Sequence, residues 1–206
     1  MIRYVALIFL LACTSPVYPV SPRSTADSTF MVTVSYDGED QWMGTAWIVA
    51  NEDDKTQLVT AGHVCQDEPD AKFTVRNLTL MAQDGETFQA VERMHAEEPD
   101  LCLIEASGNI GRRLPLAQFM PEYGSAVAYV GAPLGIWGGG LAPLYKGYYA
   151  GGNLVSIAAA GGASGSALYT LDGVFGVLVR RTVRFESLTY IETLPDLKKF
   201  LDHAGL

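Results

Sequence analysis

Short apolar runs separated by turn residues make up most of the chain after residue 28. They are rich in Val, Ile, Leu, Phe and Tyr, and a length of roughly 4 to 8 residues is typical of β-strands. Asp-Gly pairs at 37–38, 84–85 and 172–173 favour tight hairpin turns. The pattern predicts an all-β chain with about eleven strands, at 30–36, 45–50, 58–61, 73–82, 87–94, 101–105, 126–130, 154–159, 167–169, 174–179 and 188–191.

One helical period stands out near residue 200. Apolar residues at 194, 197, 200 and 201 recur at the spacing of a single helix face, and Pro195 suits a first helical turn. We therefore expect one α-helix at 194–204. The stretch 114–121 contains two prolines and lies near the middle of the chain, so we expect it to connect two β halves.

Composition narrows the classes of function. Of the 206 residues, 49% are hydrophobic and 18% are charged, which argues against a disordered chain. The 14 Lys and Arg against 23 Asp and Glu give a formal net charge of −9. Nucleic acid is therefore not an expected partner, because phosphate binding needs an excess of Lys and Arg on some face. His and Cys show no zinc-ligand spacing, and no metal or cofactor is expected.

The first residues resemble an export signal. Arg3 precedes a run of nine apolar residues at 4–12, which is too short to span a bilayer but matches a signal-peptide core. Leu-Leu-Ala-Cys at 10–13 resembles the lipobox of bacterial lipoproteins, although Leu11 departs from the usual small residue. The Pro- and Ser-rich stretch 15–23 is typical of a tether. We expect an exported protein (periplasm, cell envelope or secreted), with Cys13 either lipidated and membrane-attached or removed with the leader.

Three segments contain the residue types of a catalytic centre. The first, TAGHVC at 60–65, follows an apolar strand and contains His63. The second, EPDLCLI at 98–104, places Asp100 at the start of a strand. The third, GGASGSA at 161–167, surrounds Ser164 with small residues. Each segment alone is more typical of a structural residue or a loop, whereas the three in this order are specific.

In this order the segments resemble the chymotrypsin/trypsin-like serine peptidases, where a Thr-Ala-x-His turn, an Asp-Leu-x-Leu strand start and a Gly-x-Ser-Gly loop follow one another. The Gly-x-Pro-x-Gly turn at 131–135 is similar to the HtrA-type branch, here expected without a PDZ domain. The resemblance implies two six-stranded β-barrels with a C-terminal α-helix. It divides the chain into a leader and tether at 1–24 and a peptidase domain at 25–206, with barrels at about 28–115 and 116–192.

The resemblance also implies a role for each residue. A serine hydroxyl is a poor nucleophile, so a base must take its proton. His63 would be that base, and Asp100 would fix its tautomer and stabilise the imidazolium. The amides of Gly162 and Ser164 would stabilise the oxyanion, for which a glycine allows close backbone approach. The implied activity is that of a serine endopeptidase that hydrolyses peptide bonds through an acyl-enzyme.

Substrate selection is implied by the positions that line the primary pocket in such enzymes. Here they are Ala158, Ala159, Val179, Arg180 and Arg181. The alanines offer an apolar wall without a carboxylate, which disfavours substrates with Lys or Arg at this position. Together with Arg184, the two arginines would either receive an acidic side chain or form a solvated strand edge.

Three further positions affect this interpretation. Peptidases of this kind that are activated by proteolysis have Asp immediately before the nucleophile, whereas this chain has Ala163. We therefore expect the loop to form without a new N-terminus. Cys65 and Cys102 each follow a candidate catalytic residue by two positions and are expected near each other, as a disulfide or as two buried thiols.

Two alternatives remain open. One is a catalytically silent peptide-binding module of the same fold. The other is a narrow processing protease of phage or viral origin that cuts a single partner. In every case the expected partner is a protein or a peptide.

Overall fold

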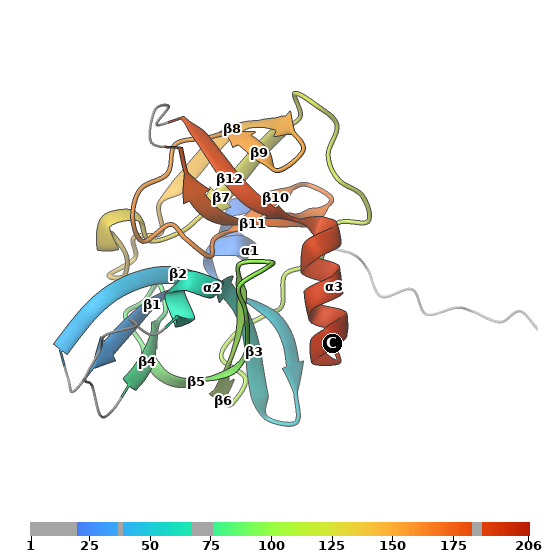
Figure 1. Ribbon diagram of the computed structural model, residues 1–206. Coiled ribbons are helices and arrows are strands. Elements are labelled where there is room, and N and C mark those ends of the chain that lie inside the picture. Colours follow the sequence, from blue (N-terminus) through green and yellow to red (C-terminus); the bar gives the residue numbers. More distant parts are fainter. Residues whose placement is uncertain (1–19, 37–38, 67–75, 183–186) are drawn as a thin grey trace, which may run out of the picture.

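Two closed antiparallel barrels of six strands each form the protein (Figure 1). The computed structural model describes residues 20–36, 39–66, 76–182 and 187–206. In the N-terminal barrel the strands follow the order β1-β2-β3-β6-β5-β4 around the barrel. Their bounds are β1 (Thr29–Tyr36), β2 (Glu39–Glu52), β3 (Lys55–Ala61), β4 (Arg76–Met81), β5 (Thr87–Ala96) and β6 (Leu101–Ser107).

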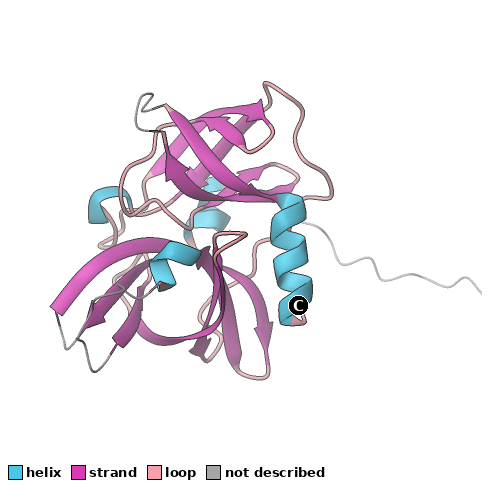
Figure 2. Cartoon of the chain, viewed as in Figure 1, coloured by secondary structure: helices cyan, strands magenta, loops and turns pink. Residues whose placement is uncertain are grey.

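The C-terminal barrel has the order β10-β11-β12-β9-β8-β7. Its strands are β7 (Ala126–Val130), β8 (Leu144–Gly151), β9 (Leu154–Ser156), β10 (Ala167–Thr170), β11 (Gly173–Arg181) and β12 (Leu188–Thr193). The helical segments are short except for the last: α1 (Pro22–Ala26), α2 (Gly62–Cys65), the 3-10 turn η1 (Pro133–Gly135) and α3 (Leu194–Ala204). The predicted all-β double barrel with a C-terminal helix is confirmed (Figure 2).

Alternation of side chains explains why the strands close into barrels. In β1 every second residue from Phe30 to Tyr36 is buried, and the residues between them are partly exposed. The strand therefore presents one apolar face to the barrel interior. The Asp-Gly pairs at 84–85 and 172–173 lie in the hairpins β4–β5 and β10–β11, whereas the pair at 37–38 lies outside the described residues.

Strand β8 is absent from the strands predicted from the sequence, because Gly147 and the surrounding glycines resemble a loop. The structure shows why a strand needs glycine there: a Cβ on Gly147 would lie 2.0 Å from the carbonyl oxygen of Ser156 in β9. Strand β9 ends at Ser156 instead of continuing to 159. The predicted strand at 73–82 is β4, which begins at Arg76, and residues 73–75 are not described.

The described residues include some that the sequence assigned to the tether. Val20 is 2% exposed, and its N–H donates to the carbonyl of Leu171 at the end of β10. Ser21 and Ser24 form a capping box at the start of α1. The segment from Val20 therefore packs on the C-terminal barrel. Cys13 and the apolar run before it lie outside the described residues.

Helix α3 packs at the seam between the barrels, alongside both of them in Figure 1. Its buried residues Leu197, Phe200 and Leu201 belong to the same apolar cluster as Trp47 of β2 and Val177 of β11. One apolar cluster therefore spans both barrels and α3. Within the described ranges, no helix has the length and apolar character needed to cross a membrane.

Candidate active site

His63 lies in α2, the one-turn helix that follows β3. Gly62 makes the turn possible, because a Cβ there would lie 2.7 Å from both the carbonyl oxygen of Ala96 and Oδ1 of Asp100. Real Cβ atoms do not approach other atoms so closely, so only glycine brings this backbone against the start of β6. The helix is thus set directly over Asp100.

His63 and Asp100 make two hydrogen bonds. The backbone N–H of His63 donates to Oδ1 at 2.7 Å, and Nδ1 lies 2.8 Å from Oδ2. A proton on Nδ1 satisfies this second bond and leaves Nε2 as an acceptor. Burial acts to raise the pKa of Asp100, but the hydrogen bonds and charge of His63 outweigh it and hold the pKa below its ordinary value. The carboxylate is therefore kept ionised and oriented.

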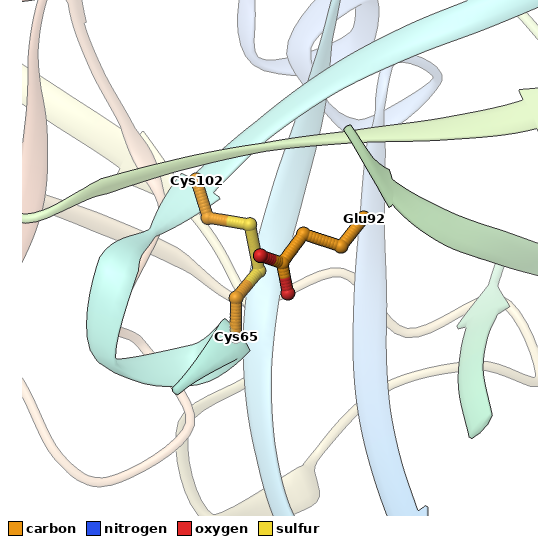
Figure 3. Close-up of side chains that lie close together, drawn as sticks. All are labelled: Cys65, Glu92 and Cys102. Atoms are coloured by element: carbon orange, nitrogen blue, oxygen red, sulfur yellow. A yellow bond between two sulfur atoms is a disulfide. The ribbon is translucent and has the colours of Figure 1, made fainter. Parts of the chain in front are cut away.

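A disulfide joins the two elements that position this pair. Cys65 ends α2 and Cys102 lies in β6, and their sulfurs are bonded, so the disulfide alternative holds rather than the free thiols (Figure 3). Glu92 of β5 points at the sulfurs in Figure 3 and pairs with Arg76 at 2.8 Å. Because each sulfur is bonded to the other, these three side chains do not form a closed metal-ligand set.

Ser164 comes from the opposite barrel, on the loop between β9 and β10. Its carbonyl oxygen accepts the N–H of Thr45 in β2 at 2.8 Å. Gly165 has φ +90°, and a Cβ there would lie 2.0 Å from the carbonyl oxygen of Thr45. A Cβ on Gly44 would lie 2.7 Å from Cγ2 of Val64 and 3.2 Å from the carbonyl oxygen of Ser164. The serine backbone is thus packed beside the turn that contains His63.

The hydroxyl of Ser164 donates to the carbonyl oxygen of Val179 at 3.4 Å, a long hydrogen bond. The structure therefore joins His63 to Asp100 directly and places the Ser164 backbone, across Gly44, beside the turn that contains His63. The Ser164 hydroxyl keeps its proton and donates it in a hydrogen bond to the carbonyl oxygen of Val179.

Two backbone amides of the Ser164 loop are candidate donors to an oxyanion. Within the described parts of the chain, neither the N–H of Gly162 nor that of Ser164 has a hydrogen-bond partner. Gly162 has φ +90°, and a Cβ there would lie 2.4 Å from the carbonyl oxygen of Ala132. Glycine is thus required by both the backbone conformation and the space.

The predicted pocket residues occupy two neighbouring segments. Ala158 is exposed and Ala159 partly exposed, after the end of β9. The sequence reasoning missed Tyr129, a buried residue of β7 whose hydroxyl donates to the carbonyl of Ala158 at 2.8 Å. No local motif marks it, because it comes from a different strand of the barrel.

The arginine segment at the end of β11 is exposed. Val179 is 8% exposed, whereas Arg180 and Arg181 are exposed; Val179 and Arg180 line the same cavity as His63. The guanidinium of Arg180 lies 5.0 Å from the ring centroid of Tyr190, a cation–π geometry. Arg184 lies outside the described residues.

A cavity of about 760 Å³ opens beside His63 and Asp100. Glu192 of β12 lines it and accepts the N–H of Asp100 at 3.1 Å. Burial raises the pKa of Glu192, and the nearby carboxylates add to this effect, while the bond from Asp100 partly offsets it. Nothing local in the sequence marks Glu192, because it reaches the site from the other barrel.

Comparison with known proteins supports the fold. A solved structure of a serine endoprotease from Yersinia pestis superimposes with a TM-score of 0.73 at 19% sequence identity. The match covers 88% of this chain and 64% of that one, so this chain spans less than two thirds of that protein's length. No protein-family model matches the chain, and no curated protein matches it. The chain has the two-barrel fold of the trypsin-like serine endoproteases.

Proposed function

We propose that the protein is a serine endopeptidase that hydrolyses peptide bonds through an acyl-enzyme. The observation that carries this proposal is the two-point contact of His63 with Asp100, at 2.7 and 2.8 Å, beside the loop of Ser164. The bond to Nδ1 holds the ring against rotation, and the bond from the backbone N–H fixes the position of His63 over Asp100.

In the proposed reaction His63 accepts the Ser164 proton on Nε2 while Oγ attacks the substrate carbonyl. The long bond from Ser164 to Val179 is readily exchanged for one to the imidazole, since it lies at the limit of hydrogen-bond length. Asp100 stabilises the imidazolium that forms. The tetrahedral oxyanion is held by the N–H groups of Gly162 and Ser164. His63 then protonates the leaving amine as the C–N bond breaks. A water molecule next gives a proton to Nε2 as it attacks the acyl carbonyl, and His63 returns that proton to Ser164 Oγ as the ester bond breaks and the acid product leaves.

The proposal extends to substrate and location. Ala158 and Ala159 present no charge to a substrate side chain, which favours an uncharged residue over Lys or Arg. The disulfide of Cys65 and Cys102 supports export, because disulfides persist mainly in oxidising compartments. Attachment of a lipid to Cys13 is part of the same proposal.

An active-site phosphonate probe tests the proposal. We expect the wild type to be labelled on Ser164 and the label to be lost in Ser164→Ala and His63→Ala. Ser107→Ala and His203→Ala are matched controls, because both residues are exposed and lie outside the site. A folded wild type that takes no label would overturn the proposal and favour the peptide-binding module. A cleavage profile limited to one sequence would favour the narrow processing protease.

A further inference from the structure

We propose that Thr45 positions the loop that holds the oxyanion, acting on it from the opposite barrel. This inference rests on the proposed function. Thr45 lies in β2 of the N-terminal barrel, is fully buried, and bonds to the loop through both its side chain and its backbone.

All four carbonyls of the loop 161–164 are hydrogen-bonded, and Thr45 provides two of the four donors. The bonds are Leu134 N–H to Gly161 O (2.6 Å), Thr45 Oγ1–H to Gly162 O (2.8 Å), Ser166 N–H to Ala163 O (3.1 Å) and Thr45 N–H to Ser164 O (2.8 Å). The two residues whose amides bind the oxyanion, Gly162 and Ser164, are the two whose carbonyls Thr45 holds.

The direction of an amide N–H depends on the carbonyls around it. In a trans peptide the N–H points opposite to the preceding C=O. The bonds to Gly161 and Ala163 therefore orient the two oxyanion donors themselves. The bonds from Thr45 fix the peptide planes that follow Gly162 and Ser164, so each donor amide is held on both sides of its Cα. Gly162 needs this restraint most, because glycine at φ +90° has no side chain to hinder rotation.

The hydroxyl of Thr45 both donates and accepts a hydrogen bond. Besides donating to Gly162, its Oγ1 accepts the N–H of Ala132 at 3.0 Å, just before η1. The carbonyl of Thr45 accepts the hydroxyl of Thr60, in the strand that leads to His63, at 2.8 Å. Thr45 thus links the η1 turn, the loop 161–164 and strand β3, which leads to His63. Together with the bonds from Leu134 and Ser166, this network fixes the loop without an ion pair at Ala163.

Thr45→Val tests the inference, because valine keeps the shape and removes only the hydroxyl. We expect kcat to fall about 10- to 100-fold with KM nearly unchanged, a smaller loss than the 10²- to 10³-fold typical of deleting an oxyanion donor itself. Binding of a peptide boronate, matched to the wild-type cleavage profile, should weaken by the same factor as kcat/KM. Thr45→Ser restores the hydroxyl and should recover most of the activity.

Thr56→Val is the matched control. Thr56 is also buried, donates to the carbonyl of Gly108 at 2.7 Å and accepts the N–H of Ile110 at 3.1 Å. It lies near the start of β3, at the end of the strand away from His63. It should lose stability without losing kcat. If Thr45→Val does not fold, Thr45→Cys makes the same comparison, because a thiol is a weaker donor.

Equal kcat values for the Thr45 and Thr56 variants would overturn the inference, as would an unchanged affinity for the boronate. A wild type that neither cleaves peptides nor takes the phosphonate label would instead overturn the proposed function. The two failures are therefore distinguishable.

Discussion

The disulfide between Cys65 and Cys102 makes a quantitative prediction about stability. We consider the double variant Cys65→Ala/Cys102→Ala, which removes the cross-link and keeps both Cβ atoms. The bond spans a sequence separation of 37 residues and lies in the core of the N-terminal barrel, where the cysteines are 1% and 0% exposed. Its loss frees the unfolded chain and leaves the hydrogen-bonded barrel in place.

The expected loss in the free energy of unfolding follows from loop-closure entropy. A closed loop of this size restricts the unfolded chain by about 4 kcal/mol at 25 °C. In a protein of about this length, 1 kcal/mol changes Tm by roughly 2–4 °C, so the variant should melt about 8–16 °C lower.

Chemical denaturation and calorimetry measure this change. The wild type, unfolded with and without a thiol reductant, provides the control for lost packing, because the reduced protein keeps both sulfurs. The variant should be insensitive to the reductant. Peptidase activity of the folded variant should be largely retained, because His63 and Asp100 still make both hydrogen bonds. A free energy of unfolding within about 1 kcal/mol of the oxidised wild type would refute the reasoning.

Two further predictions concern single residues. Gly162→Ala should lower kcat by about 10²- to 10³-fold in a peptide-cleavage assay, since its Cβ would lie 2.4 Å from the carbonyl of Ala132 and displace an oxyanion donor; unchanged kcat would contradict this role. Glu192→Gln should raise Tm at pH 8. Folding raises the pKa of Glu192 above its ordinary value of 4.5. The protonated side chain therefore stabilises the folded protein below pH 4.5, and this contribution is lost as the pH rises through the folded-state pKa. The difference in Tm from the wild type should vanish near pH 4, and a difference independent of pH would contradict the assignment.

The strands were predictable where local alternation decides them. In β1 the buried and partly exposed residues follow the period of two that the sequence shows. Strand β8 was not predictable, because Gly147 is needed by the close approach of Ser156, a contact that no local pattern contains.

The residues of the candidate site likewise fall into two groups, those with a local sequence signal and those without one. His63, Asp100 and Ser164 stand in local contexts that the sequence displays, and the structure brings their segments together. Thr45 and Glu192 reach the site only through packing of one barrel against the other, at sequence distances of 117 and 92 residues from their partners. A single sequence gives no local signal for such contacts. Whether Cys65 and Cys102 bond likewise depended on the fold.

Each end of the described chain packs against the barrel that is farther from it in the sequence. The segment from Val20 through α1 belongs to the N-terminal side but packs on the C-terminal barrel, while α3 follows the C-terminal barrel and shares a core with Trp47. A break in the connection 108–125 would therefore give two fragments, each with one whole barrel and a terminal segment that packs on the other fragment. Neither fragment would contain both the imidazole and the alcohol. If the proposed peptidase activity is present, its recovery would show that the two fragments have associated, so the fold could serve as a split-protein reporter.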